Sequence, residues 1–220
     1  LYAVADGPVT DRLYTVDPFT GAATFVANLT TPLSGTSFGV DFNPVVDRLR
    51  VVSYADQNLR IHPDTGNVTV DAALNPANPN VVAAAYTNST AGAGATALYG
   101  IDSGTDNLVL QNPANAGALA VIGALGVNAT DVAGFEIAVE ANVAYAALRV
   151  GAATQLYTID LATGAALAVG PIGGNPLLDG VTSLPPYDVF DPKPSVDGPT
   201  PLVHQMLIHV QDRPPRVGQF

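Results

Sequence analysis

The chain alternates apolar and polar positions in short runs, and each run ends at residues typical of turns. β-Branched and aromatic residues are common in the runs, whereas no segment keeps an apolar period of 3.6. Alternation of this kind is typical of half-buried β-strands. The pattern therefore predicts an all-β chain.

One strand–turn–strand unit recurs, closed each time by a glycine. It occupies residues 13–21, 58–66 and 156–164, with a looser copy at 108–117 that has one extra residue. Asp17 can accept backbone hydrogen bonds in its turn, and the closing glycine supplies a positive φ. Each copy is therefore predicted to be an antiparallel hairpin.

Two more short strands precede each hairpin, and four short strands in 40–50 residues are typical of β-propeller blades. We expect a propeller-like array of about four four-stranded blades, three of them at 36–75, 80–124 and 129–173. Residues 1–28 hold only the last three strands of a blade. Two interpretations stay open: residues 177–184 supply its first strand and close the ring, or further sequence precedes Leu1 and the ring is incomplete.

Prolines mark a change of character after residue 184. Eight of them fall in residues 185–220, which favours an extended tail after a propeller domain of residues 1–184. Within the tail, residues 201–211 are an apolar strand candidate. We expect this segment to pair with an exposed sheet edge, either of its own domain or of another chain.

Composition excludes several classes of function. The net charge is −11 and Lys193 is the one lysine, so a basic surface for nucleic acid is missing. No apolar run approaches 18 residues, which predicts no membrane span. The absence of cysteine excludes disulfides and thiolate metal sites.

The most distinctive stretch is residues 38–53 (FGVDFNPVVDRLRVVS). Together with residues 57–60, 84–88 and 156–164, it resembles the domain-of-unknown-function family DUF4394 over about residues 1–174. The resemblance implies a propeller-like fold in a secreted or cell-surface bacterial protein. No catalytic activity is established for the family, so it implies no site residues. Its members usually carry a further repeat before the point that matches Leu1, which implies an incomplete chain.

Candidate chemical groups are few. His62 lies in a repeat turn, where a surface turn residue is expected. His204 and His209 would point to opposite faces of a strand, so they are not expected to share a metal ion. No serine stands in a nucleophile-elbow sequence, and Ser53 is interpreted as a strand cap. Calcium at residues 102–107 is an alternative to a plain hairpin turn there. We predict no cofactor and no metal.

Charged residues surround the hairpin of the family-like motif: Asp41, Asp47, Arg48 and Arg50. We interpret them as structural, with Asp41 or Asp47 accepting backbone N–H bonds in the turn around Pro44, or paired with an arginine. An active site is the alternative interpretation.

Four Asn-x-Ser/Thr sequons, each at an expected strand end or turn, are candidate N-glycosylation sites: Asn28, Asn67, Asn88 and Asn128.

Function is predicted from what the repeats contain. They consist of turn-forming residues and packing residues, so we expect a non-catalytic extracellular or cell-surface module that is structural or binds partners. The partner would be another protein or a second copy, held by strand addition through the tail. The alternatives are a propeller enzyme, a hydrolase or a lyase, and a carbohydrate-binding module.

Overall fold

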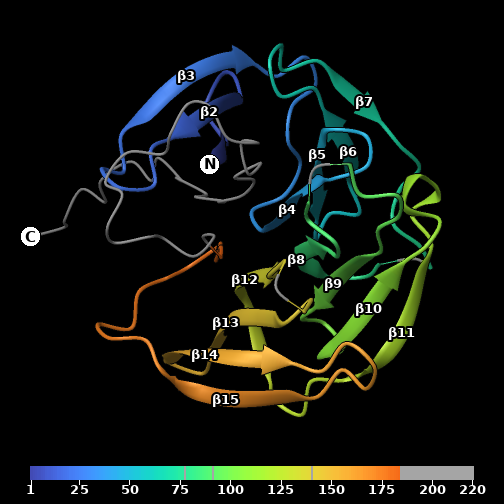
Figure 1. The fold of residues 1–220 in the computed structure, drawn as a ribbon, viewed down its shortest axis with the longest axis vertical. Coiled ribbons are helices and arrows are strands. Elements are labelled where there is room, and N and C mark those ends of the chain that lie inside the picture. Colours follow the sequence, from blue (N-terminus) through green and yellow to red (C-terminus); the bar gives the residue numbers. More distant parts are fainter. Residues whose placement is uncertain (77, 91, 140, 184–220) are drawn as a thin grey trace, which may run out of the picture.

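The computed structural model describes residues 1–76, 78–90, 92–139 and 141–183, and these form four antiparallel sheets arranged in a ring (Figure 1). The first sheet has three strands and the others have four. The three complete sheets coincide with the blades expected at 36–75, 80–124 and 129–173, so the all-β propeller prediction is confirmed.

Each sheet is an antiparallel meander, and its strands follow one another from the inside of the ring to the outside (Figure 1). The first is β1 (Tyr2–Ala5), β2 (Arg12–Val16) and β3 (Ala23–Asn28). The second is β4 (Phe38–Asn43), β5 (Arg48–Ser53), β6 (Asn58–Ile61) and β7 (Val68–Val70). The third is β8 (Val81–Tyr86), β9 (Leu98–Asp102), β10 (Asn107–Gln111) and β11 (Leu119–Ala124), and the fourth is β12 (Ala129–Ile137), β13 (Ala144–Val150), β14 (Ala153–Ile159) and β15 (Ala166–Pro171).

The recurring glycine turns form as predicted. Asp17 Oδ1 accepts the backbone N–H groups of Phe19 and Thr20, and Asp160 Oδ1 repeats this pattern in the fourth sheet with the N–H groups of Ala162 and Thr163. The closing glycines, Gly21, Gly66, Gly117 and Gly164, have φ values of 71°, 67°, 65° and 84°, a region that favours glycine. In the looser copy, a 3₁₀ turn (Ala114–Ala116) accommodates the extra residue.

The core lies between neighbouring sheets. Leu13 and Val4 of the first sheet pack on Leu59 of the second, and Phe135 and Ile137 of the fourth belong to the cluster shared with the third. These side chains are almost fully buried. Packing of one sheet face on the next, repeated around the ring, holds the four sheets together.

The innermost strands approach one another at glycines. A Cβ at Gly39 of β4 would lie 2.5 Å from the Ala83 carbonyl carbon of β8. A Cβ at Gly134 of β12 would meet Gly180 in the same way, also at 2.5 Å from its carbonyl carbon. Residues around Gly180 therefore stand against β12 as β8 stands against β4.

The predicted strand at 177–184 is wrong over residues 177–183, which are not assigned to any strand. Among the described residues β1 pairs with β2 alone, and the first sheet stays three-stranded. The interpretation in which this segment supplies the first strand therefore lacks its hydrogen-bonded ladder among the described residues, although residues around Gly180 do lie against β12. Residues 184–220, with the strand candidate at 201–211, lie outside the described residues.

Candidate functional site

Two carboxylates occupy equivalent positions on alternate innermost strands. Asp41 follows Gly39 by two residues on β4, and Glu136 follows Gly134 by two residues on β12. Their side chains are 2% and 4% exposed. Because the residues next to both acids are apolar and mostly buried, an acid at this depth needs dedicated partners.

Each acid binds the backbone of the next segment around the axis. Asp41 Oδ2 accepts the N–H of Tyr86 on β8, and its Oδ1 accepts the N–H of Phe42. Glu136 Oε1 accepts the Ser183 hydroxyl at 3.0 Å, and the carboxyl also interacts with the backbone N–H of Ser183. The two acids thus make the same kind of contact half a ring apart.

Burial decides the protonation of the pair. It raises the pKa of Asp41 well above its usual range, and the charge of Glu136 raises it further, against the two N–H groups that favour ionisation. Burial likewise raises the pKa of Glu136 to about 8, although the contacts with Ser183 oppose it. At neutral pH the pair therefore retains a proton.

A raised carboxyl pKa is typical of a general acid, which needs space for a substrate beside it, and the described residues leave a small cavity between the inner strands at the axis. The cavity there measures about 10 Å³, roughly what a single water requires, and Val40, Phe135 and Val181 are among its lining residues. No group of three or more His, Cys, Asp or Glu side chains within the described residues is placed to hold a metal ion. What this arrangement can do is hold neighbouring inner segments together.

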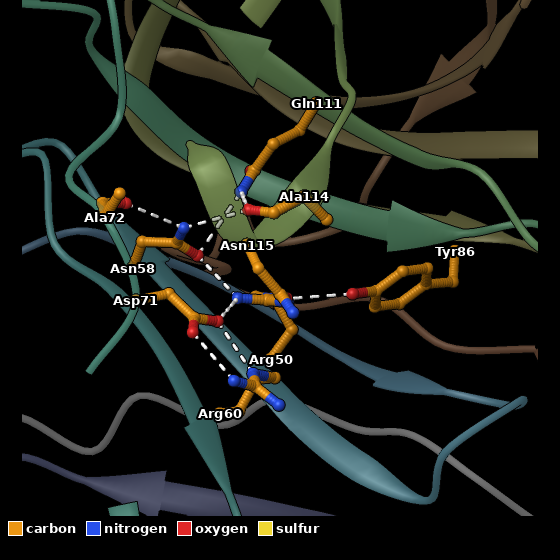
Figure 2. A network of polar contacts seen from close by, with 9 residues as sticks. All are labelled: Arg50, Asn58, Arg60, Asp71, Ala72, Tyr86, Gln111, Ala114 and Asn115. Carbon is orange, nitrogen blue, oxygen red and sulfur yellow. Dashed lines mark hydrogen bonds and ion pairs between the residues drawn. The ribbon is translucent and has the colours of Figure 1, made fainter. Parts of the chain in front are cut away.

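A second buried polar cluster joins the second and third sheets around Arg50, which is 1% exposed (Figure 2). Its Nη1 donates to Asn58 Oδ1 at 2.7 Å and to Asp71 Oδ2 at 2.8 Å. From the third sheet, Tyr86 OH accepts from Nε at 3.2 Å and Asn115 Oδ1 accepts from Nη2 at 2.6 Å. The guanidinium therefore links both sheets.

Asp71 completes the cluster as a shared acceptor. Arg60 binds it with Nε at 2.7 Å and Nη2 at 2.8 Å, a bidentate pair. Burial alone would raise the pKa of Asp71, but the hydrogen bonds and charges of Arg60 and Arg50 outweigh burial and hold it below its usual value. Asn58 and Gln111 also donate to the carbonyl of Ala114. With its charged groups paired internally, the cluster is a clamp between sheets.

A comparison with protein-family models identifies the family of the chain. The family model for a domain of unknown function, DUF4394, matches residues 1–182. The chain belongs to this family. A search of curated proteins found no match to this DUF4394 domain.

The structure corrects the predicted role of the acids near Pro44. The turn after β4 uses Asn43, whose Oδ1 accepts the N–H groups of Val45 and Val46. Asp41 points instead to the axis, and Asp47 lies in the turn with a φ of 47°. The expected arginine pairing exists, but it joins Arg50 to Asp71.

Other sequence candidates lie where local structure needs them. Ser53 Oγ accepts the N–H of Ala55 just after β5, a strand-end contact as expected. His62 Nδ1 accepts the N–H of Asp64 in its hairpin turn. Residues 102–107 connect β9 to β10, and Asp102 Oδ1 accepts the N–H of Gly104 there, which is a hairpin turn.

All four sequon asparagines are exposed, at strand ends or turns: Asn28, Asn67, Asn88 and Asn128. Asn88 differs from the others because its side-chain amide is engaged. Its Nδ2 donates to the carbonyl of Ala95 at 3.1 Å, and its Oδ1 accepts from Asn142 at 3.0 Å. Exposure makes the four sites accessible for modification.

Two larger concavities lie away from the axis. One, of about 460 Å³, covers a face of the first sheet and is lined mainly by apolar residues, including Ala3, Val16 and Ala23. The other, of about 380 Å³, lies beside the Arg50 clamp and includes the side chains of Asn43, Asn112 and Asn115. Neither was signalled by a sequence motif, since each combines residues from several strands and loops.

Proposed function

We propose that this DUF4394 domain is a non-catalytic structural or interaction module that acts outside the cell, secreted or at the cell surface. Its partner is another protein or a second copy of the chain. The observation that supports it is the difference, among the described residues, between a cavity of about 10 Å³ at the inner strands and a groove of about 460 Å³ along the first sheet. Open sheet edges are common sites for added strands, and exposed apolar faces are common sites of protein contact.

Exposed side chains favour binding at the first sheet. Phe25 on β3 is 53% exposed and contacts the ring of Tyr14, with 6.0 Å between ring centroids. Val9, in the loop before β2, is 92% exposed. Among the described residues no helix has the length and apolar character to cross a membrane.

Peptide binding tests the proposal. Peptides selected from a displayed library on the full chain should follow an alternating apolar pattern. They should bind the Ala23→Asp variant at least about tenfold more weakly, because a charge in the apolar face must be desolvated. Val70→Asp, at a similarly exposed position on β7, should leave binding unchanged. Peptides equally sensitive to both variants, or to neither, would refute the assignment.

A second candidate function is carbohydrate binding in the groove beside the clamp. Its lining combines several side-chain amides with apolar residues such as Leu98 and Pro113, and it carries no charged side chain. Amides are suitable partners for sugar hydroxyls. A glycan array probed with the wild type and with Asn112→Ala tests this candidate, which fails if no glycan distinguishes the two proteins.

A further inference from the structure

Two partners of the Arg50 guanidinium each keep a hydrogen-bond donor that the clamp does not use (Figure 2). Tyr86 OH accepts from Arg50 Nε, so the hydrogen of this hydroxyl points away from that nitrogen. Asn115 Oδ1 accepts from Arg50 Nη2, which fixes the orientation of the amide and leaves Nδ2 as a donor. In the part of the chain that the structure describes, neither donor has an acceptor. Each is therefore available to a ligand.

Both donors belong to residues that line the groove of about 380 Å³ beside the clamp. Tyr86 is 1% exposed, so its side chain lies deep in the wall of the groove. Asn112, Pro113 and Asn115 are exposed and belong to the same lining. The groove therefore joins a buried donor to a rim that solvent reaches, and its volume is typical of sites for small molecules.

Two other lining side chains show which further groups a ligand would meet. Asn43 Oδ1 accepts two N–H groups of its own turn, which leaves its Nδ2 as a donor. Gln111 is 4% exposed, and its Nε2 donates to two oxygens of the clamp, so its Oε1 remains as an acceptor. Together with the Tyr86 and Asn115 donors, these groups give the lining more free donors than free acceptors within the described residues.

Positive charge lies next to these donors. Arg50 and Arg60 share the carboxylate of Asp71, so the three groups together keep one positive charge. Because Arg50 is buried, salt screens its charge only weakly. A group that accepts from a cation also donates more strongly, since linked hydrogen bonds polarise one another. Tyr86 and Asn115 therefore transmit this charge to the groove, where it favours an anionic oxygen.

We propose that the groove beside the clamp binds a uronic acid, a sugar that carries a carboxylate. The carboxylate accepts from the Tyr86 hydroxyl and the Asn115 amide, because an ionised carboxyl group accepts hydrogen bonds and cannot donate them. The ring hydroxyls both donate and accept, so they bind Gln111 Oε1 and the Asn112 amide. This inference rests on the second candidate function, carbohydrate binding, and is independent of partner binding at the first sheet.

Two sugars that differ in one group test the proposal on the full chain. Methyl glucuronide has a carboxylate where methyl glucoside has a hydroxymethyl group, and ligand-observed NMR titrations at neutral pH measure the affinity of each. The glucuronide should bind at least about tenfold more tightly, because it alone places a charged oxygen on the two donors.

A variant of Asn115 locates the carboxylate. Asn115→Asp keeps an oxygen for Arg50 Nη2 but replaces the donor by a charged oxygen. It should weaken glucuronide binding at least about tenfold and change glucoside binding less than about threefold, because only the glucuronide is repelled. Asn128→Asp adds the same charge at an exposed asparagine outside the groove lining and should leave both affinities unchanged. Tyr86→Phe removes the other donor and should also reduce the glucuronide preference, with circular dichroism establishing that each variant is folded.

Each outcome decides a separate point. Equal affinities of the wild type for the two sugars would overturn the uronic acid assignment, and carbohydrate binding would stand. A glucuronide preference that persists in Asn115→Asp, or that is lost equally in Asn128→Asp, would also overturn it, because the carboxylate would then lie elsewhere. Binding of neither sugar would overturn the inference as well, and a glycan array without a hit would then remove the candidate function on which it rests.

Discussion

Replacing Glu136 by glutamine should remove most of one pH dependence from the stability of the ring. The amide keeps an oxygen for the Ser183 hydroxyl but cannot ionise. Glu136 has a pKa of 4.5 in the unfolded chain and about 8 in the folded one. The folded state therefore binds the proton more tightly, and this contribution is fully present below pH 4.5 and is lost as the pH rises towards 8.

The size of the effect follows from the two pKa values. At 1.36 kcal/mol per pKa unit, they correspond to about 4–5 kcal/mol, and coupling to Asp41 reduces what one substitution removes. We expect the stability of Glu136→Gln relative to the wild type to increase by about 3 kcal/mol between pH 5 and pH 8. For a domain of this length that is a change of about 6–12 °C in Tm.

Urea unfolding followed by circular dichroism at several pH values provides the measurement. Asp17→Asn is the control, because Asp17 is an exposed turn acid. The N–H groups of Phe19 and Thr20 lower its pKa, so its contribution is lost only in acid. Its profile should run parallel to that of the wild type from pH 5 to pH 8. If the Glu136→Gln profile did so as well, the interpretation of the buried acid would be wrong.

Three further predictions concern the clamp, the axial glycines and the sequons. Arg50→Met should lower the free energy of unfolding by about 3–5 kcal/mol, because it leaves buried acceptors unpaired. Arg48→Met removes only a surface bond to the Asp47 carbonyl and should change that free energy by no more than about 0.5 kcal/mol. Equal effects of the two variants in urea titrations would contradict the clamp. Gly39→Ala should cost about 1–3 kcal/mol because its Cβ would meet the backbone of β8, while Gly170→Ala, with open space around it, serves as the control in thermal unfolding. Secreted from a eukaryotic cell, the chain should carry glycans at Asn28, Asn67 and Asn128 in preference to Asn88, whose amide already binds the Ala95 carbonyl; peptide mass spectrometry with Asn88 most occupied would disprove this order.

Local chemistry explains which parts of the fold could be predicted. The turn at Asp17 to Gly21 is specified by five adjacent residues, so its copies and the sheets around them were recognisable in the sequence. The interpretation of residues 177–184 as a first strand is not met over residues 177–183, because such a strand depends on a ladder with β1, a partner nearly the whole chain away. Asp41 was assigned to a turn for a similar reason: Asn43 is an equally good local acceptor, and the Tyr86 N–H that Asp41 binds is 45 residues distant.

The candidate site was harder to predict than the fold. Arg50 and Asn115 are 65 residues apart and meet only once two sheets pack. One signal was present for the axial acids: Asp41 and Glu136 each follow a glycine by two residues and have apolar residues on either side. A charge repeated at the same place in two copies of a buried element indicates a shared structural task, even before the partners are known.

Among the residues that the structure describes, β1 and the segment around Gly180 form no ladder, and this affects how the ring unfolds. Where stability is a sum of nearest-neighbour contacts, a closed circle has no weakest point, but a broken one has two ends. Within the described part of the chain, the second and third sheets each pack on two neighbouring sheets, while the first and fourth stand at the ends of the row. Partial unfolding should therefore start at these ends and proceed inward, as a zip opens, with the second and third sheets the last to yield.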